Sequence, residues 1–271
     1  MPRVFPNRLR KQHRMAPKDI SSEQAVLSTR EDAIAALVAS ANEVVLRSLI
    51  DDPAFDETHV CLLLERKDLS GLLLEEISKR KTWRAVYRVR VALAAHPHTP
   101  RLIAMRLLRE LHLMDIVRIS LLPTTPMELR RLADERLLSQ LPQLPLGQKL
   151  TLARRGSTRV AAGLVAHGPE QAARIALDNS FLTEAQLLKT LAKESLPARI
   201  LAAVASHAKW SKLVNIRVAL LRHPHTPADH LSGLVAGLPR RDLEDLLELS
   251  RLRQSVRGYL SEELSERMKD R

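Results

Sequence analysis

Apolar residues recur at steps of three and four along most of the chain, as they do at Leu187, Leu188 and Leu191. This spacing places side chains on one face of an α-helix. No stretch alternates apolar β-branched or aromatic residues with polar ones, as a half-buried strand would. The pattern therefore predicts an all-α chain of short helices, most of about ten to fourteen residues, joined by connections of about two to five.

Threonine–proline pairs mark the expected starts of several helices: Thr99-Pro100, Thr125-Pro126 and Thr226-Pro227. Threonine is a good N-cap, and proline suits the first helical position because the N–H that it lacks has no helical partner there. Ser157 or Thr158 is expected to cap another helix. Thr183 and Gln186 have the spacing of a capping box.

One part of the chain is duplicated. Trp83, Arg90-Val91-Ala92-Leu93 and His96-Pro97-His98-Thr99-Pro100 return 127 positions later as Trp210, Arg217-Val218-Ala219-Leu220 and His223-Pro224-His225-Thr226-Pro227. The offset holds without a gap over residues 33–110 and 160–237. Short amphipathic helices cannot each bury an apolar face alone, so we expect them to stack on their neighbours as an α-solenoid.

The stretch Arg90-Val91-Ala92-Leu93-Ala94-Ala95-His96-Pro97-His98-Thr99-Pro100 resembles the repeat unit of HEAT-like and leucine-rich repeat variant proteins of bacteria. The resemblance extends over roughly residues 33–237. It implies stacked helix pairs in a right-handed superhelix. This chain has histidine where those repeats usually have asparagine. It also lacks the amino-terminal cysteine cluster of some members, so no cluster cofactor is implied.

These observations predict three regions. Residues 1–30 form a basic disordered arm, residues 31–239 form the repeat solenoid, and residues 240–271 form helices that cap its end. The last stretch balances acidic and basic residues, and its leucines suit the polar-faced cap that a solenoid needs to cover its terminal apolar surface.

Composition narrows the classes of protein and site. The chain has 271 residues with two Trp, two Tyr, three Phe and eight Gly, too few for a typical β-sandwich or barrel. The single cysteine, Cys61, excludes an intrachain disulfide framework and any multi-cysteine metal site. No apolar run is long enough to span a membrane. We expect a cytoplasmic protein without a metal or cofactor.

The formal net charge is +12, and the amino-terminal arm supplies a large share of it. No acidic residue precedes Asp19. The candidate binding residues in the arm are Arg8, Arg10, Lys11 and Arg14. The arm is interpreted either as a solvated tail that aids solubility or as an electrostatic contact for a phosphate-rich partner.

Residues 79–90 form the most basic segment, with six cations and no acid. Its candidate binding residues are Lys79, Arg80, Lys81, Arg84 and Arg88. Trp83 and Tyr87 lie one helical turn apart within it. A basic helix with two inward-facing aromatic rings is one interpretation, and a nucleic-acid contact is the other. The less basic second copy favours a packing role for Trp83 and Trp210.

Two further sets of residues recur. The pairs His96/His98 and His223/His225 are expected to bond the backbone in turns, since two histidines make an incomplete metal site. A basic residue also recurs at Arg47, Arg90, Arg118, Lys149, Arg174 and Arg217. These side chains are expected to bond neighbouring carboxylates or loop carbonyls, with a phosphate-binding ladder as the alternative.

No common catalytic motif occurs in the sequence. The leading functional hypothesis is a non-catalytic repeat scaffold that binds another macromolecule, with a protein as the favoured partner. The alternative is a nucleic-acid-binding protein that uses the arm and residues 79–90. Some alkylpurine DNA glycosylases are built of HEAT-like repeats, which adds a third hypothesis: Trp83 and Tyr87 would hold a base beside Asp51, Asp52 or Asp178.

Overall fold

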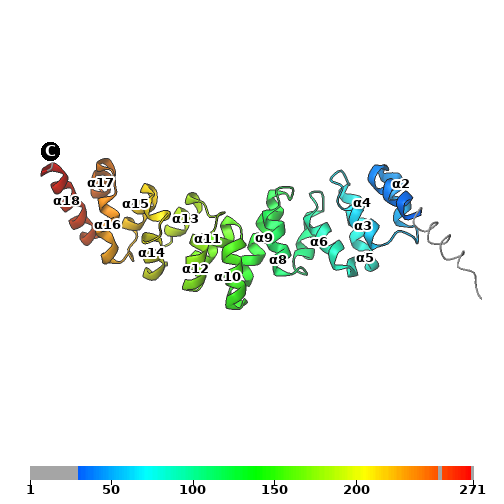
Figure 1. Ribbon diagram of the computed structural model, residues 1–271, viewed down its shortest axis with the longest axis horizontal. Coiled ribbons are helices and arrows are strands. Elements are labelled where there is room, and N and C mark those ends of the chain that lie inside the picture. Colours follow the sequence, from blue (N-terminus) through cyan, green and yellow to red (C-terminus); the bar gives the residue numbers. More distant parts are fainter. Residues whose placement is uncertain (1–29, 250–251, 270–271) are drawn as a thin grey trace, which may run out of the picture. The chain divides into compact units, whose positions relative to one another are not determined.

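A computed structural model describes residues 30–249 and 252–269, and within these ranges the chain is helical with no strand (Figure 1). The expected all-α class is confirmed. No helix in the described ranges combines the length and apolar content needed to cross a bilayer. The chain divides into two compact units, with the boundary between Ala92 and Leu93.

The first unit contains short helices, and side chains cap α2, α3 and α4. Its helices are α2 (Glu43–Ile50), α3 (Glu57–Leu63), α4 (Gly71–Lys79), α5 (Lys81–Ala85) and most of α6 (Tyr87–Ala95), and residues 30–40 are also helical. Asn42 caps α2 by accepting a hydrogen bond from the Val45 N–H. In the core, Trp83 packs edge-on against Phe55.

The second unit holds the remaining helices. They are α7 (Arg101–Leu108), α8 (Leu113–Leu121), α9 (Met127–Gln140), η1 (Leu141–Gln143), α10 (Leu146–Arg155), α11 (Thr158–His167), α12 (Glu170–Leu177), α13 (Glu184–Leu191), α14 (Ala198–Ala205), η2 (Trp210–Lys212), α15 (Val214–Arg222), η3 (Ala228–His230), α16 (Leu231–Ala236), α17 (Arg240–Leu247) and α18 (Gln254–Lys269).

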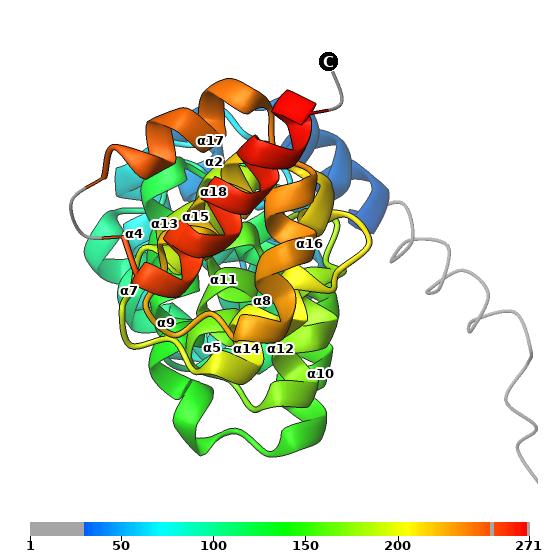
Figure 2. The same cartoon turned by 90° about the vertical axis from the view of Figure 1, so that its left-hand side faces the viewer.

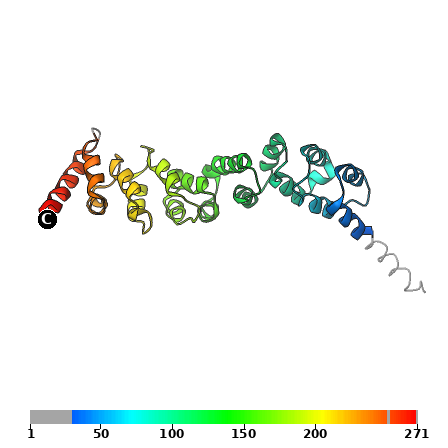
Figure 3. The ribbon, with the colours of Figure 1, turned by 90° about the horizontal axis from the view of Figure 1, so that it is seen from above.

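Helices of the second unit pack in chain order. α7, α9, α11, α13 and α15 contact one another in succession, and so do α10, α12 and α14. Contacts of α11 with α10 and α12 join the two rows. Figure 3 shows the helices of this unit following one another from α8 to α18, and Figure 2 views the unit from its α17–α18 end. Each helix thereby buries its apolar face on its neighbours.

The helix boundaries recur at the offset of the duplication and continue beyond it. α2 and α12 match residue for residue, and α6 matches α15. α8 and α17 begin 127 positions apart, as do α9 and α18. Ile116 and Leu243 are buried at equivalent positions, and so are Leu129 and Val256. The recurrence therefore includes residues 240–269, where apolar positions are kept although few identities remain.

Many helix ends in both units are held by side chains from later in the chain. The last carbonyls of an α-helix have no partner within it. Arg80 donates to the Ile50 carbonyl at 2.8 Å, and at the equivalent position the Trp210 indole donates to the Leu177 carbonyl at 2.8 Å. Arg267 likewise donates to the Ala236 carbonyl. Some of the arginines that give the chain its positive charge therefore stabilise helix ends.

The caps predicted at Thr99, Thr125 and Thr226 are wrong, whereas those at Ser157 and Thr183 are confirmed. Proline occupies the N-cap of α7, α9 and η3. The Thr99 hydroxyl instead donates to the Leu93 carbonyl at 2.6 Å, and the Thr226 hydroxyl donates to the Leu220 carbonyl. A hydroxyl that closes the preceding helix in this way points away from the next one. Ser157 caps α11 by accepting from the Val160 N–H.

Candidate functional site

Cations of the basic segment 79–90 make local contacts, and several of them are exposed. Lys79 pairs with Glu75 at 2.9 Å. Arg80 bonds Asp51 and the Ile50 carbonyl, and its guanidinium lies 4.8 Å from the centre of the Trp83 ring. Lys81, Arg84 and Arg88 are exposed. The nucleic-acid contact there stays a prediction, and so does that of Arg8, Arg10, Lys11 and Arg14, which lie outside the described residues together with the arm up to residue 29.

The two tryptophans are packing residues, as expected. Trp83 is 7% exposed and Trp210 is 1% exposed. Neither ring therefore offers a free face to a base. Asp178, a carboxylate of the glycosylase hypothesis, pairs with His207 at 3.0 Å.

The recurrent histidines and some of the recurrent basic residues make local hydrogen bonds and ion pairs. His96 and His223 each accept a hydrogen bond from the backbone N–H two residues later, which confirms their place in turns. Arg174 pairs with Glu170 on its own helix, and Arg217 donates to the Ser211 carbonyl of η2 and to carbonyls of α16. No cluster of three or more metal-ligating side chains occurs in the described ranges.

Two adjoining pockets lie on the α9–α11–α13 row of the second unit. One has a volume of about 460 Å³ and the other about 770 Å³. They share Arg159, Gln186 and Lys189 in their walls. We call the surface of both pockets the basic groove, because its lining includes Arg130, Arg131, Lys149, Arg159, Lys189, Lys193 and His167.

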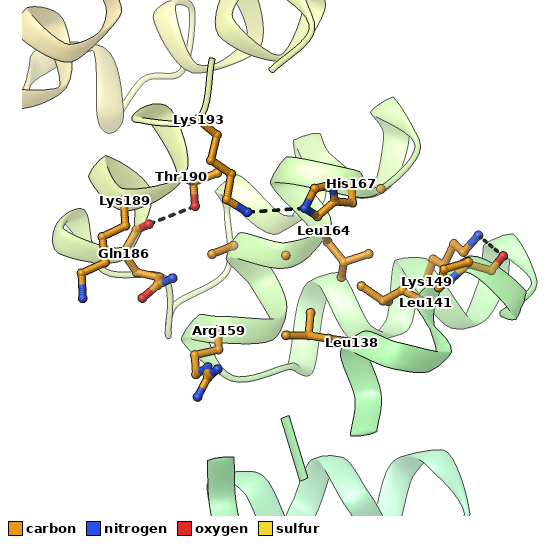
Figure 4. Close-up of a pocket in the computed structure, with 14 residues that line it drawn as sticks. Leu138, Leu141, Lys149, Arg159, Leu164, His167, Gln186, Lys189, Thr190 and Lys193 are labelled. Carbon is orange, nitrogen blue, oxygen red and sulfur yellow. Dashed lines mark hydrogen bonds between the residues drawn. The ribbon is translucent and has the colours of Figure 1, made fainter. Parts of the chain in front are cut away.

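Residues of α9, α10, α11 and α13 line the smaller pocket (Figure 4). Arg159 comes from α11, and Lys189 and Gln186 come from α13. Lys193, just beyond α13, places its Nζ atom 3.4 Å from Nε2 of His167. The walls also include the apolar side chains of Leu138, Leu141 and Leu164.

A small residue brings α9 and α11 close together at this pocket. A Cβ atom on Gly163 would lie 2.2 Å from Cδ2 of Leu138. Ala162 and Gly163 both line the pocket. The close approach of Leu138 to α11 therefore depends on Gly163.

The groove carries little negative charge. Among its described lining residues, Asp134 is the only carboxylate, and it is 5% exposed. Burial raises the pKa of Asp134, although a hydrogen bond from Ser157 opposes the rise. The Ser157 hydroxyl donates to Oδ1 of Asp134 at 2.6 Å. Asp134 thus links α9 to the start of α11, while Glu135, 3.7 Å from Arg159, contributes a carboxylate nearby.

An exposed aromatic ring lines the larger pocket. Phe181 is 49% exposed and lies in the turn between α12 and α13. Asn179, which is 3% exposed, holds this turn: its side-chain oxygen accepts from the Phe181 N–H at 2.7 Å. Its side-chain nitrogen donates to the carbonyls of Ala153 and Gly156. The turn is thereby fixed to the end of α10.

The first copy of the duplication lacks these groove residues. Asp32 stands 127 positions before Arg159, Ala54 before Phe181, and Leu62 before Lys189. The helical framework recurs, but the charge and the aromatic ring do not. The basic groove is therefore a property of the second unit and not of the repeat as such.

Sequence reasoning missed this groove because its cations are scattered between residues 130 and 193. No short window holds enough of them to stand out as residues 79–90 do. The usable signal was the duplication itself, since an arginine and a lysine replace Asp32 and Leu62 at matching positions. Where the two copies share the same helices but only one carries the charge, the charge is not needed for packing and indicates a binding role.

No protein-family model, no curated protein and no solved structure matches the chain.

Proposed function

We propose that this chain is a non-catalytic helical-repeat protein, a HEAT-like solenoid of right-handed stacked helix pairs, that binds nucleic acid through the basic groove. The succession of helix contacts in the second unit supports the solenoid assignment. The observation that favours a nucleic acid is the groove itself. Six lysine and arginine side chains line it, and its one lining carboxylate is buried.

The physical reason is counterion release. A cation that neutralises a phosphate frees the ions condensed on the nucleic acid, so binding gains free energy that falls as salt rises. Lys189 and Lys193 are exposed, and Arg159 is 35% exposed, so their charged ends are within reach of a phosphate backbone. The overall charge of +12 adds long-range attraction.

A scaffold that binds a protein is the second candidate. Leu102 is 77% exposed on α7 and Met127 is 69% exposed at the start of α9, and exposed apolar side chains favour protein contacts. An acidic polypeptide with apolar side chains would pack on these two residues and pair its carboxylates with the cations of the groove. The test therefore includes an acidic polymer.

The experiment measures fluorescence anisotropy of labelled oligonucleotides of about 20 nucleotides, at about 50 and about 200 mM salt. We expect the unmodified protein to bind and to lose affinity steeply as salt rises. The paired substitution Arg159→Glu and Lys189→Glu is expected to weaken binding at least about tenfold, because two attractive charges become repulsive. Arg241→Glu on α17 is the control, since Arg241 is 90% exposed and lies outside the groove.

Two results would overturn the proposal. One is the absence of any salt-sensitive binding to DNA or RNA. The other is tighter binding of polyglutamate than of the oligonucleotides with the same dependence on Arg159 and Lys189, which would assign the groove to an acidic protein.

A further inference from the structure

We infer that the larger pocket binds single-stranded nucleic acid by stacking a base on Phe181 while the surrounding cations hold the phosphates. This inference rests on the proposed function and adds the form of the nucleic acid and the contact that selects it. The two can fail separately, because stacking and charge are removed by different substitutions.

The first observation is that basic side chains line the same pocket as Phe181. Its ring is 49% exposed in a pocket of about 770 Å³ that Arg130, Arg131, Arg159 and Lys189 also line. Aromatic rings beside a basic track are the combination used for single strands, because every base has a π-face to stack. The exposed phenyl ring is apolar, so covering it with a base removes apolar surface from water, which is favourable.

The second observation is the scarcity of such rings on this molecule. Phe55, Trp83 and Trp210 are all at most 7% exposed. Among the aromatic side chains in the described ranges, Phe181 and Tyr259 are the exposed ones, and Tyr259 lines neither pocket of the groove. The exposure of Phe181 therefore coincides with the basic groove.

The third observation is the rigid support of the ring. The buried Asn179 side chain holds the Phe181 N–H and two carbonyls at the end of α10. A ring on a fixed turn loses little conformational freedom when a base stacks on it, so more of the contact energy appears as affinity.

The first copy shows that this turn does not need the phenyl ring. There Oδ1 of Asp52 accepts from the Ala54 N–H at 2.8 Å, as Asn179 accepts from Phe181. The next N–H, of Phe55, donates to the Asp52 carbonyl at 2.9 Å, which matches Leu182 and Asn179 at 3.0 Å. The same turn thus exists with alanine, and a Phe181→Ala variant is expected to keep the backbone.

A single strand meets these conditions better than a duplex. In a duplex both faces of each base are covered by its neighbours, so a ring on a turn has nothing to stack on without unstacking the helix. In a single strand a base can leave the stack at low cost and enter the pocket.

The experiment compares two oligonucleotides with equal numbers of phosphates: a single strand of thymidines, and the same strand with abasic sites. The unmodified protein is expected to bind the thymidine strand about tenfold more tightly. Phe181→Ala should bring the two affinities together, and Phe181→Trp should preserve the difference. Because Trp83 and Trp210 are buried, the new tryptophan should supply a fluorescence signal that bases quench.

Each outcome separates the two claims. Equal binding of the thymidine and abasic strands by the unmodified protein, or an unchanged preference in Phe181→Ala, would overturn stacking and leave the basic groove in place. Equal or tighter binding of a duplex of the same length would overturn the preference for a single strand. If the unmodified protein binds no oligonucleotide at all, the proposed function is overturned as well. A circular dichroism melt of each variant checks that it folds.

Discussion

Trp210 donates its indole N–H to the carbonyl of Leu177, 2.8 Å away, and so holds the last turn of α12 from a segment that lies after α14. In the first copy Arg80 donates to the equivalent carbonyl, that of Ile50. The duplication has therefore kept the contact while changing the residue that makes it.

Replacing Trp210 by phenylalanine should cost more stability than replacing Trp83 by phenylalanine. Both changes remove part of a buried ring, but only Trp210→Phe leaves the Leu177 carbonyl without its donor. We expect an extra loss of about 1–3 kcal/mol in the free energy of unfolding. Urea denaturation followed by circular dichroism measures it, and equal losses in the two variants would show that the hydrogen bond contributes nothing.

Asn179→Ala should destabilise the second unit strongly. The substitution leaves two carbonyls and one N–H without partners in a site where the residue is 3% exposed. We expect a loss of about 3 kcal/mol in urea denaturation. Asp178→Ala, next to it, is the control: this side chain is 78% exposed in its pair with His207, so its loss should cost less than about 1 kcal/mol. A similar loss of stability in both variants would contradict a stabilising role for the three Asn179 hydrogen bonds.

The stability contribution of Asp134 should depend on pH. Because burial raises its pKa, the folded protein holds the proton more tightly than the unfolded chain does. The resulting stabilisation is present below the ordinary aspartate pKa of about 4 and is lost as pH rises through the folded value. The stability of the unmodified protein relative to Asp134→Asn should therefore fall as pH rises above about 4.

Urea midpoints of the two proteins, measured at several pH values from acid to neutral, test this expectation. Asparagine keeps an acceptor for the Ser157 hydroxyl without a titrating proton. A difference between the two proteins that stays constant with pH would show that Asp134 ionises as it does in the unfolded chain.

The segment 79–90 and the amino-terminal arm should matter less for binding than the groove. We expect the variant Lys81→Glu, Arg84→Glu and Arg88→Glu, with residues 1–18 deleted, to retain more affinity for the thymidine strand than Arg159→Glu with Lys189→Glu. The first variant alters more charges, and a larger loss of affinity there would assign the contact to the arm and residues 79–90 in place of the groove. Arg80 is left intact, because its bond to the Ile50 carbonyl makes it structural.

The sequence was sufficient for the class of fold. Apolar steps of three and four do not depend on long-range contacts, so they predicted helices that the structure confirms. Burial of Trp83 and Trp210 followed from their recurrence with different charged neighbours. The caps predicted at the threonine–proline pairs failed, although the Thr183 cap is confirmed. A hydroxyl beside proline has two possible backbone partners, and the sequence does not say which helix it will bond.

The chain by itself determined that helices form, where many of them begin, and that one block of them occurs twice. Those features follow from local backbone preference and from a repeated pattern that can be read in one dimension. Only the tertiary structure decided which cationic side chains bond the carbonyls at helix ends and which line the pocket around Phe181. Arg130, Arg159 and Lys189 come from three helices far apart in sequence, and only packing of these helices in one row brings their charges together.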